Sequence, residues 1–515
     1  MMIAPARPAG TASPPSVLAA GFTSVELENA LASLPATIEE VTASSRDARR
    51  GFAFLAYPGA SRDGRDFIAD AITRGASAIL FDPAGFAWNA EWKVPHLGVP
   101  DLKQHASQIA GSVYRHPAEV LWMTGVTGTN GKTSVSQWIA QGLQLAGRKA
   151  GVIGTIGNGL VGQLLPSDNT TPDAVTLQRT LREMLRAGAT SCAMEVSSHG
   201  LDQGRVADIK YDVAVFTNLT RDHLDYHGTM EAYGEAKARL FALRGLKVAV
   251  INVDDPFGVA LADRLAGQPG NQVELIRYST RQNGHVANLA AKNVAVHAGG
   301  LSFDVAGAFG SATVESDILG AFNISNLLAV IGALLAAGIG LRQAADIAGQ
   351  LQPVPGRMQT VRVTNKPLIV VDYAHTPDAL EKALSTLAAI VPENGRLISV
   401  FGCGGDRDRG KRPQMGAISA RYADLSIITS DNPRTEDAVR IIGDIVDGMG
   451  SAPRRTIADR QQAIYEALNE ARAADIVAIA GKGHEDYQII GDAKHHFSDV
   501  EVAGEALAAW KGGRP

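Results

Sequence analysis

Cysteine is scarce in this sequence, and long hydrophobic runs are missing. The 515 residues include only Cys192 and Cys403, too few for a disulfide framework or a cysteine-based zinc site. Such sparing use of cysteine is typical of proteins that work in a reducing cytoplasm. The longest uncharged apolar run, Leu327–Leu341, has 15 residues and three glycines, whereas a membrane-spanning helix needs about 18 or more. We therefore predict a cytoplasmic protein without membrane insertion, in which this run forms a buried helix.

The sequence also lacks an excess of basic residues. It has 48 basic and 53 acidic side chains, for a net charge of −5. A general nucleic-acid binder is usually basic overall, so we expect no nucleic-acid partner; a local basic pocket for an anionic substrate remains compatible with this balance. Hydrophobic residues make up 45% and charged residues 20%, which indicates a folded core rather than disorder. The first 20 residues are rich in proline and alanine, lack an apolar core of signal-peptide length, and are expected to form a flexible tail.

The chain length suggests about three domains, at roughly 150 residues each. Short apolar strands alternate with helical stretches, which predicts an α/β protein with mainly parallel sheets and right-handed crossovers. The predicted strands are 52–56, 77–81, 121–126, 193–196, 213–217, 248–252, 368–371, 397–401, 425–429 and 476–480. Helices are predicted at 67–74, at 175–185, at 232–243 and from the loop after 121–126 to residue 145. A Pro- and Gly-containing break at 352–356 separates the last four strands. We predict a small α/β domain at 21–117, a central domain at 118–355 and a second doubly wound domain at 356–515.

The strongest local signal follows the strand predicted at 121–126. The loop reads Thr127-Gly128-Thr129-Asn130-Gly131-Lys132-Thr133 and opens a helix. Backbone N–H groups at such a helix start converge on one point, which suits a phosphate chain. Lys132 would reach the β- and γ-phosphates and the Thr133 hydroxyl would bind Mg²⁺. The spacing departs from the strict phosphate-loop pattern, because Val126 stands where a glycine is required and Gly125 lies one place earlier.

The alternative for this loop is a tight strand-to-helix turn with an accidental Lys-Thr pair. The agreement of strand and helix context favours the phosphate loop. A signalling GTPase would also need an Asn-Lys-x-Asp base reader, and the candidate at 365–368 ends in leucine. The phosphate loop therefore predicts an ATP site, which by itself names no reaction.

Glu195 ends the next buried strand, where a second Mg²⁺ ligand belongs in a doubly wound sheet. Alternation places Ser197 on the same face. The alternative is an ordinary polar strand end. His223 and His227 are four residues apart, as in zinc peptidases, but Leu224 follows His223 where those enzymes have glutamate. A lone histidine is more often structural than ligating, and the position of His223 after a strand near the phosphate loop favours a functional role.

Six motifs in this order resemble the Mur ligases, the ATP-dependent ligases of peptidoglycan precursor synthesis. They are the phosphate loop, Glu-Val-Ser-Ser-His-Gly-Leu at 195–201, Asp-His-Leu-Asp-Tyr-His at 222–227, Phe-Asn-Ile-Ser-Asn at 322–326, Pro-Gly-Arg-Met at 355–358 and Asp-Tyr-Ala-His-Thr-Pro at 372–377. The resemblance extends from about Ser45 to about Gln488. It implies a domain for the UDP group, a central ATPase domain and a C-terminal Rossmann-like domain. It also implies a reaction in which a carboxylate is phosphorylated by ATP and the acyl phosphate is then attacked by an amine.

The resemblance assigns roles around the nucleotide. Gly128 to Thr133 would hold the phosphates, with Lys132, Glu195, His223 and Lys237 as the catalytic set. Thr133, Glu195 and His223 would bind Mg²⁺ together with Lys237, which matches a lysine that is carbamylated in this family. From the sequence alone Lys237 reads as a solvated helix lysine. Contacts to adenine or ribose are implied for Asn326, Arg357, Asp372 and His375.

The resemblance also assigns the substrate anchors. The muramoyl dipeptide would be held by Asn169, Thr170, Thr171, Ser197, Gln203 and Arg205. A guanidinium at Arg205 suits a substrate that carries a pyrophosphate and carboxylates. Ser45 matches a uridine-site serine, although Ser44 stands where the family has aspartate.

The motif Asp431-Asn432-Pro433-Arg434 resembles the signature of family members that add meso-2,6-diaminopimelate to UDP-N-acetylmuramoyl-L-alanyl-D-glutamate. Diaminopimelate has one more carboxylate than lysine, at its far end, and a planar guanidinium binds a carboxylate in a bidentate pair. Arg434 and Arg407 are the candidates for this contact, while the Gly481 carbonyl and Glu485 would accept hydrogen bonds from the distal ammonium. The alternative for the motif is a simple Asn-Pro turn before a helix.

Three other functions remain open at this point. The first is a lysine-adding ligase of the same family, and the second is an enzyme like folylpolyglutamate synthase. The third is a phosphate-loop binding module without ligase chemistry.

Overall fold

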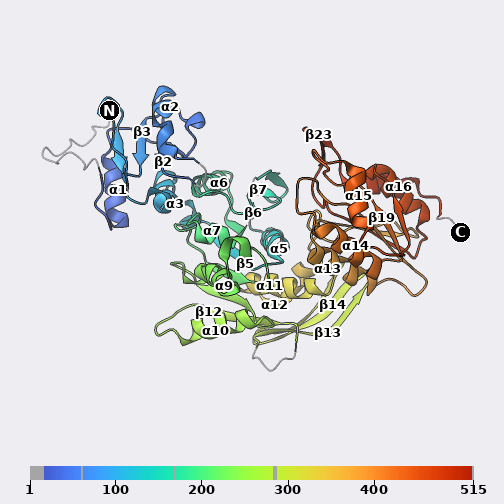
Figure 1. Cartoon of the computed structure of the whole chain (residues 1–515). Coiled ribbons are helices and arrows are strands. Elements are labelled where there is room, and N and C mark those ends of the chain that lie inside the picture. Colours follow the sequence, from blue (N-terminus) through green and yellow to red (C-terminus); the bar gives the residue numbers. More distant parts are fainter. Residues whose placement is uncertain (1–16, 60–61, 168, 282–286, 513–515) are drawn as a thin grey trace. The chain divides into compact units, whose positions relative to one another are not determined.

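The computed structural model describes residues 17–59, 62–167, 169–281 and 287–512. They form three mainly parallel sheets of 4, 11 and 6 strands and a two-stranded hairpin (Figure 1). This confirms the predicted α/β class. None of the helices in these ranges is long and apolar enough to cross a membrane. By their contacts, the described residues divide into two compact units. One comprises the residues up to Lys132, Gly147–Ala249 and Asp263–Leu275, and the other Thr133–Ala146, Val250–Ala262 and the residues from Ile276 on.

The first sheet is parallel, with the order β1-β2-β3-β4. Its elements are α1 (Ser24–Ser33), β1 (Glu40–Thr42), η1 (Ser45–Asp47), β2 (Phe52–Ala56), η2 (Gly64–Phe67), α2 (Ile68–Thr73), β3 (Ala78–Phe81), β4 (His96–Gly98) and α3 (Leu102–Tyr114). Side chains of β2 alternate between two cores: Ala53 and Leu55 pack with residues of α1 and α3, whereas Phe54 packs with α2. This alternation puts helices on both faces of the sheet.

The predicted N-terminal tail overlaps this domain at its end. Residues 1–16 lie outside the described part of the chain. Val17 pairs with Gly98 in a parallel bridge, and the Leu18 N–H donates to the Gly98 carbonyl at 2.8 Å. Leu18 is also buried in the core of the first sheet. Residues 17 and 18 therefore belong to the folded domain.

The second sheet has the order β15-β14-β13-β12-β11-β10-β5-β9-β6-β7-β8. Its strands are β5 (Trp122–Thr127), β6 (Ala150–Gly154), β7 (Gly157–Leu160), β8 (Gln163–Leu165), β9 (Ser191–Glu195), β10 (Val213–Phe216), β11 (Val248–Asn252), β12 (Glu274–Ser279), β13 (Leu289–His297), β14 (Gly300–Gly307) and β15 (Gly310–Ser316). The helices of this segment are α4 (Pro117–Val120), α5 (Lys132–Leu145), α6 (Ala174–Arg186), α7 (Ser198–Asp202), α8 (Leu224–His227), α9 (Met230–Ala238), η3 (Arg239–Ala242), α10 (Pro256–Gly267), α11 (Phe322–Ala336) and α12 (Leu341–Gln350).

This segment differs from the sequence predictions in several strands and in one helix. The strands β6, β7, β8 and β12 were not predicted. The antiparallel strands β13, β14 and β15 were not predicted, and Figure 1 shows β13 and β14 as a long ribbon. Along β14, the buried side chains of Leu301, Phe303 and Val305 alternate with half-buried Ser302 and Asp304. Such half-buried strands have no continuous apolar run and so give a weak sequence signal.

The buried helix predicted within Leu327–Leu341 is present as the second part of α11, but its predicted extent to Leu341 is wrong. Helix α11 ends at Ala336, and α12 begins at Leu341. Gly338 has φ +85°, and the Ile339 N–H donates to the Leu334 carbonyl at 3.0 Å, which closes α11. A glycine in this left-handed conformation is the usual way to end a helix. The run is therefore one helix, a turn and the first residue of the next helix.

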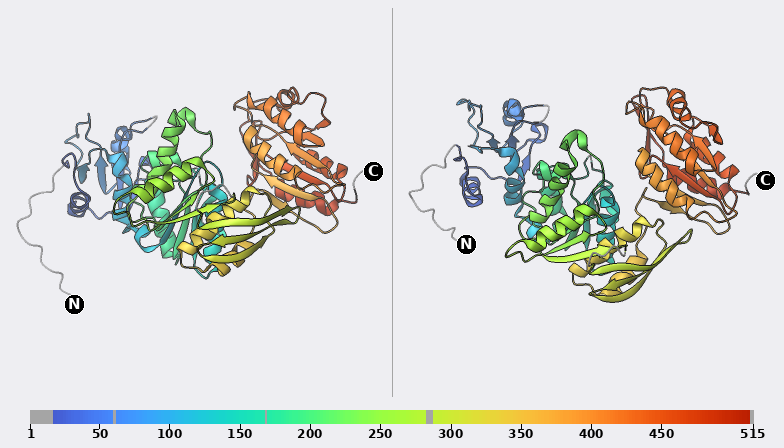
Figure 2. Two further views of the ribbon diagram at one scale, coloured as in Figure 1. Left: turned by 90° about the horizontal axis from the view of Figure 1, so that it is seen from below. Right: turned by 60° about the horizontal axis from the view of Figure 1, so that its bottom comes forward.

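The third sheet has the order β16-β17-β21-β18-β19-β20 and is parallel except for β16. Its elements are β16 (Gln359–Val361), β17 (Leu368–Asp372), α13 (Pro377–Ala388), β18 (Leu397–Phe401), α14 (Lys411–Tyr422), β19 (Leu425–Ile428), α15 (Ala438–Val446), β20 (Arg454–Thr456), α16 (Arg460–Glu470), β21 (Ile476–Ala480) and α17 (Asp499–Ala509), with the hairpin β22 (Tyr487–Ile490) and β23 (Ala493–His496). Residues of α13, α14 and α15 form one core with the sheet, and residues of α16 and α17 form the other. Figure 2 shows these orange and red helices on both faces of their sheet.

The carboxyl ends of the parallel strands carry the loops that matter for function. Asp372 is the last residue of β17, and the loops after β18, β19 and β21 contain Gly404, Asp431 and Gly481 respectively. In doubly wound sheets, ligands bind outside this edge of the sheet. The doubly wound C-terminal part predicted from the sequence is confirmed, with its motifs on that edge.

Candidate functional site

The predicted strand, loop and helix of the phosphate loop are present. Strand β5 ends at Thr127, and α5 begins at Lys132. Gly128 has φ +145°, and a Cβ at this position would overlap the Thr217 Oγ1 atom, so a side chain is excluded there. The Lys132 ammonium donates to the carbonyls of Gly128 at 3.0 Å and Thr129 at 2.8 Å. A cation and the N–H groups of the first helical turn thus lie together, as an anion site requires.

The loop after β10 holds the phosphate loop in place. The N–H groups of Thr129 and Asn130 donate to the backbone carbonyl and the side-chain Oδ1 of Asn218, at 2.8 and 2.9 Å. Thr217 Oγ1 donates in turn to the Asn130 carbonyl at 2.7 Å. Because the N–H groups of Thr129 and Asn130 face Asn218, they do not point at a phosphate. The donors that would bind a phosphate are the N–H groups at the start of α5 and the Lys132 ammonium. The sequence analysis gave Asn218 no role, although its place directly after a strand next to β5 is a usable signal.

Glu195 ends β9 in register with Val126 of β5, one residue before the end of β5. Its side chain is 1% exposed. The carboxylate accepts from the Thr155 N–H at 2.8 Å and from the Thr155 hydroxyl at 3.3 Å. A Cβ on Gly154 would overlap Glu195 Oε1, so this glycine makes room for the carboxylate. The structure thus places a fixed carboxylate at the end of the strand beside β5, as predicted.

Hydrogen bonds connect most of the residues that were predicted to hold the dipeptide substrate. Thr171 Oγ1 donates to the Glu195 carbonyl at 2.9 Å and accepts from the Ser197 N–H at 3.0 Å. Arg205 donates to the Thr171 carbonyl at 2.6 Å and also to the Gln203 side chain at 2.6 and 3.0 Å. The structure therefore brings these residues together next to Glu195. Two neighbours complete the group: Thr170 Oγ1 lies 3.0 Å from Thr155 Oγ1, and the Asn169 carbonyl accepts from Ser167 at 2.9 Å.

Lys237 lies at the phosphate loop and not in solvent. Its side chain is 1% exposed, and its ammonium donates to the Gly128 carbonyl at 2.9 Å. The ammonium also lies 4.2 Å from the ring centroid of Tyr233, one helical turn earlier on α9. Burial, and then the nearby charge of Lys132, hold the pKa of Lys237 well below its usual value. A lowered pKa favours the neutral amine, which is the nucleophilic form of lysine.

Tyr233 connects three predicted site residues and was missed by the sequence analysis. Besides its contact with Lys237, its hydroxyl lies 3.3 Å from Thr129 Oγ1. Its ring centroid lies 6.0 Å from that of His223. The signal that could have found Tyr233 is its i−4 spacing from Lys237 on a helix.

His223 stands in a cluster of histidine and tyrosine rings. It has φ +53° and precedes α8. Its ring centroid lies 4.9 Å from that of His199, and its Nε2 lies 3.5 Å from Asp222. Burial lowers the pKa of His199 and of His227, so these imidazoles are mostly neutral near pH 7. Neutral imidazole is the form that binds a metal ion.

The predicted nucleotide contacts of the C-terminal part lie at the end of β17. The Asp372 carboxylate accepts from the N–H groups of Met358 at 2.7 Å and Ala374 at 2.9 Å. Arg357 lies over the Tyr373 ring, 5.0 Å from its centroid. His375 Nδ1 lies 2.8 Å from the Tyr373 carbonyl, and the side chain is exposed. Asn326 lies on the buried side of α11, where its amide donates to Asn323 at 2.8 Å. The structure joins the β17 residues into one group and shows Asn326 bound within its own helix.

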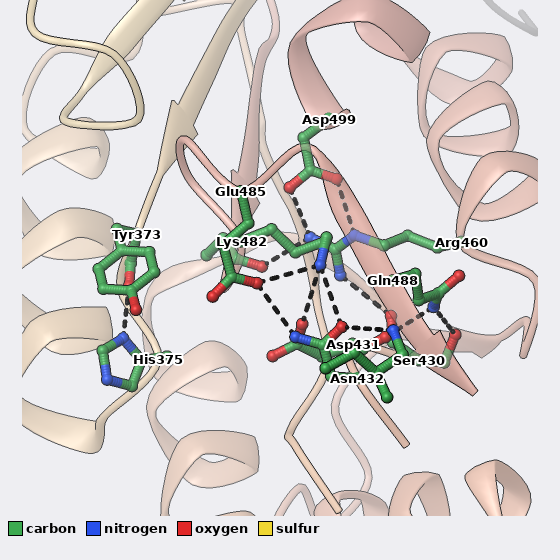
Figure 3. A network of polar contacts seen from close by, with 12 residues as sticks. Tyr373, His375, Ser430, Asp431, Asn432, Arg460, Lys482, Glu485, Gln488 and Asp499 are labelled. Carbon is green, nitrogen blue, oxygen red and sulfur yellow. Dashed lines mark hydrogen bonds and ion pairs between the residues drawn. The ribbon is translucent and has the colours of Figure 1, made fainter. Parts of the chain in front are cut away.

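The Asp431-Asn432 turn is part of a buried polar network (Figure 3). The Asn432 amide donates to Glu485 Oε2 at 3.0 Å and accepts from the Ile489 N–H at 2.9 Å. Lys482, fully buried, donates to Asn432 Oδ1 at 3.3 Å and to Glu485 Oε2 at 3.2 Å. Gly481 has φ +118°, and the site of its missing Cβ is 3.6 Å from Asp431 Oδ2. Lys482 was not among the site residues predicted from the sequence.

Arg434 and Arg407 approach the same glycine. The site of the missing Gly404 Cβ is 3.0 Å from Arg434 Nη1 and 3.6 Å from Arg407 Cγ. Arg434, at φ +52°, donates to the Gly405 carbonyl at 2.8 Å. A Cβ on Gly405 would overlap the Pro433 carbonyl, so the two loops touch through their backbones. The Arg434 guanidinium and the side-chain stem of Arg407 thus approach Gly404 from two separate loops.

Ser45 in the first domain is buried at 8% exposure and starts η1. Its hydroxyl hydrogen-bonds Asp70 on α2 and thereby lowers the pKa of that carboxyl. A uridine contact by Ser45 stays a prediction.

Three family models match the chain in sequence order. They are the Mur ligase family, catalytic domain at residues 37–114, the Mur ligase middle domain at 126–334, and the Mur ligase, glutamate ligase domain at 356–483. The UDP-N-acetylmuramoyl-L-alanyl-D-glutamate–2,6-diaminopimelate ligase of Chromobacterium violaceum is 52% identical, over 93% of this chain and 96% of its own length. The protein of the same name from Pseudomonas aeruginosa is 49% identical, over 92% of this chain and 96% of its own length.

Solved structures give the same result. A structure of a UDP-N-acetylmuramoyl-L-alanyl-D-glutamate–2,6-diaminopimelate ligase superposes with a TM-score of 0.70 at 40% identity, covering 92% of this chain and 95% of that one. Folylpolyglutamate synthase of Mycobacterium tuberculosis shares the fold, with a TM-score of 0.58 over 74% of this chain and 92% of its own, but at only 18% identity. The matches cover most of the chain, and the phosphate loop, Glu195 and the turn after β19 lie where the sequence predicted them. The chain therefore belongs to the Mur ligase family.

Proposed function

We propose that this ligase joins meso-2,6-diaminopimelate to UDP-N-acetylmuramoyl-L-alanyl-D-glutamate at the expense of ATP, in the cytoplasm, as a step in peptidoglycan precursor synthesis. The observation that carries the proposal is the meeting of Arg434 and Arg407 at Gly404, beside the Asn432–Glu485 pair. Two cations and a carboxylate suit the distal end of diaminopimelate, which has both a carboxylate and an ammonium. Lysine lacks that carboxylate and would leave the guanidinium groups unpaired.

The reaction requires a carboxylate to become a good acyl donor. A carboxylate oxygen of the dipeptide attacks the γ-phosphorus of ATP, and ADP leaves with the bond electrons. The amine of diaminopimelate then attacks the acyl carbon, loses a proton, and inorganic phosphate departs. Lys132 and the start of α5 neutralise the charge that moves between the phosphates. Arg205, Thr171 and Ser197 hold the dipeptide so that its carboxylate is aligned with the phosphate.

The donor atoms at the phosphate loop fit Mg²⁺, a cation that prefers oxygen ligands. Thr133 and Glu195, which offer oxygen donors, and the imidazole nitrogen of His223 would hold it, and the metal would supply charge neutralisation of the transferring phosphoryl group. Within the described residues, no group of three or more His, Cys, Asp or Glu side chains could hold a metal ion by itself. Mg²⁺ typically keeps water and substrate phosphate oxygens among its ligands, so a small protein donor set is adequate.

We infer that Lys237 is carbamylated. Its amine is buried beside Gly128, with a pKa held well below the usual value. A neutral amine attacks the carbon of CO2, forms an N–C bond and releases a proton. The product is an anion, which would attract a metal where an ammonium would repel it.

A ¹³C NMR experiment tests this modification without relying on turnover. The full-length protein equilibrated with ¹³C-bicarbonate is expected to show a protein carbamate signal. The signal should be absent from Lys237→Met and retained in Lys292→Met, a matched change at an exposed lysine of β13. A carbamate signal of equal size in Lys237→Met would contradict the assignment.

The remaining proposed contacts are those to the nucleoside of ATP, to diaminopimelate and to the uridine. Arg357, Asp372 and His375 would meet adenine or ribose from the edge of the third sheet, with Asn326 on α11. Gly481 and Glu485 would accept from the distal ammonium of diaminopimelate. Ser45 would contact the uridine.

Phosphate release decides among the candidate functions. The assay contains ATP, Mg²⁺ and UDP-N-acetylmuramoyl-L-alanyl-D-glutamate, with meso-diaminopimelate, with L-lysine or with no amine. We expect release only with diaminopimelate. Preference for lysine would keep the ligase chemistry and overturn the pocket assignment.

A further inference from the structure

The ion pairs around the Asp431-Asn432 turn do not balance. Among the groups that these ion pairs join, three carboxylates, those of Asp431, Glu485 and Asp499, meet two cations, Arg460 and Lys482, a balance of minus one. Asp499, Arg460 and Lys482 are fully buried, and Asp431 is 8% exposed. In Figure 3 the Lys482 ammonium lies between Asp431, Asn432 and Glu485. An unbalanced charge in a buried network is costly unless a ligand supplies the counter-charge.

The two cations, Arg460 and Lys482, have different bonding partners. Arg460 is fully engaged: it pairs with both Asp499 oxygens at 2.7 Å and donates to the carbonyls of Ser430 at 3.1 Å and Ala480 at 3.0 Å. Lys482 instead contacts the side chains that face the proposed amino-acid site. It lies 3.7 Å from Asp431 Oδ1, which has no hydrogen-bond donor among the described residues.

Lys482 also determines which carboxylate oxygen of Glu485 accepts hydrogen bonds from other protein groups. Both Lys482 and Asn432 contact Glu485 Oε2, at 3.2 and 3.0 Å. The other oxygen, Oε1, is then the one presented to a ligand. The glycines on either side of Lys482 have φ values of +118° and +54°, so the backbone of this loop is one that turns the lysine inward.

We propose that Lys482 is a positioning residue for the incoming amino acid, because its buried ammonium holds the side chains of Asn432 and Glu485 in place. Even with Lys482, the ion-paired network is one positive charge short. The distal ammonium of the substrate supplies that charge. This inference rests on the proposed function in assigning the Glu485 side of the network to the amine substrate. Lys482 itself is buried beneath the two side chains and acts through them.

The proposal predicts an altered pH dependence when Lys482 is replaced. Burial raises the pKa of the Asp431 carboxyl, the charge of Glu485 raises it further, and Arg460 and Lys482 lower it. Other groups around the pair are Asp499, Asp486, Arg434, Arg357, Tyr373 and Tyr487. Without Lys482, the Asp431 carboxyl is expected to keep a proton up to higher pH. Ammonium binding needs this carboxylate ionised, so affinity is lost as the pH falls.

The test compares the KM for diaminopimelate, the KM for ATP and kcat of the full-length enzyme between pH 6 and 9. For Lys482→Met we expect the KM for diaminopimelate to rise about 30-fold or more at pH 8. It should rise further towards pH 6, while kcat and the KM for ATP change little. Lys482→Arg should keep the flat pH profile. Lys382→Met, at a half-exposed surface lysine of α13, is the matched control and should behave as wild type.

A second variant keeps the proposal open to refutation if Lys482→Met folds poorly. Lys482→Met combined with Asp431→Asn removes one charge of each sign and restores the balance of minus one. It is expected to show a raised KM that no longer depends on pH. A wild-type KM in Lys482→Met, or a pH-dependent KM in the double variant, would overturn the proposal.

The test of Lys482 can be distinguished from the test of the proposed function. L-Lysine has the same distal ammonium, so the Lys482 comparison can be run with whichever amine the wild-type enzyme uses. Wild-type preference for lysine would overturn the proposed substrate, and the KM and pH profile would still decide the role of Lys482.

Discussion

Arg434→Glu is expected to lose roughly 10³-fold or more in kcat/KM for meso-diaminopimelate, because the distal carboxylate would then meet an anion instead of its guanidinium partner. The Arg434 backbone is held independently of its side chain: its N–H donates to the Ile489 carbonyl at 3.1 Å and its carbonyl accepts from Gly491 at 2.8 Å. The turn should therefore persist in the variant. Binding of an ATP analogue is expected to stay nearly unchanged.

The measurement is phosphate release with diaminopimelate and with L-lysine, alongside nucleotide binding by calorimetry. Lysine has no distal carboxylate, so its use should fall much less and the preference for diaminopimelate should disappear. Arg440→Glu, at an exposed arginine of α15, controls for the change in net charge. If Arg434→Glu retains diaminopimelate turnover like Arg440→Glu, the specificity assignment is wrong.

Asp499→Asn is expected to destabilise the C-terminal sheet by about 3–5 kcal/mol. Asp499 and Arg460 are both fully buried and joined by two hydrogen bonds of 2.7 Å. The variant removes the ion-pair partner of the buried guanidinium. The same guanidinium donates to the carbonyls of Ser430, after β19, and Ala480, at the end of β21. For a domain of roughly 150 residues, this loss should lower the melting temperature of the C-terminal part by about 6–20 °C.

Hydrogen exchange of peptides from β18 and β21, measured with thermal unfolding of the full chain, locates the effect in this sheet. Asp378→Asn is the matched control, because Asp378 pairs with Lys382 on the surface of α13 at 72% and 50% side-chain exposure. Exposed pairs of this kind contribute about 0–1 kcal/mol. Equal melting temperatures for the two variants would show that the buried pair does not stabilise the sheet.

Much of the candidate site was predictable because its residues are tied to strand ends. Lys132, Glu195, Asp372 and Asp431 each follow a short apolar strand, and in a parallel sheet such ends share one edge. The order of six short motifs was sufficient to indicate the family. The fold class and the positions of most buried parallel strands followed from hydrophobic pattern alone, whereas the buried parallel strand β6 was not predicted.

Other residues could be assigned only from the tertiary structure. Lys237 reads in sequence as a solvated helix lysine, and the fold buries it against Gly128 and Tyr233. The sequence gives no reason to single out Arg460 and Asp499, which lie 39 positions apart and meet only because α16 and α17 pack together.

By itself, the sequence determined the α/β class, the family and the strand-end motifs, because these depend on local patterns of burial and turn chemistry. Only the tertiary structure decided where the apolar run at 327–341 turns, how β13–β15 pair, and which charges Lys482 and Arg460 balance. The physical reason is that burial and pairing of a charge are set by neighbours distant in sequence, and no local pattern encodes them.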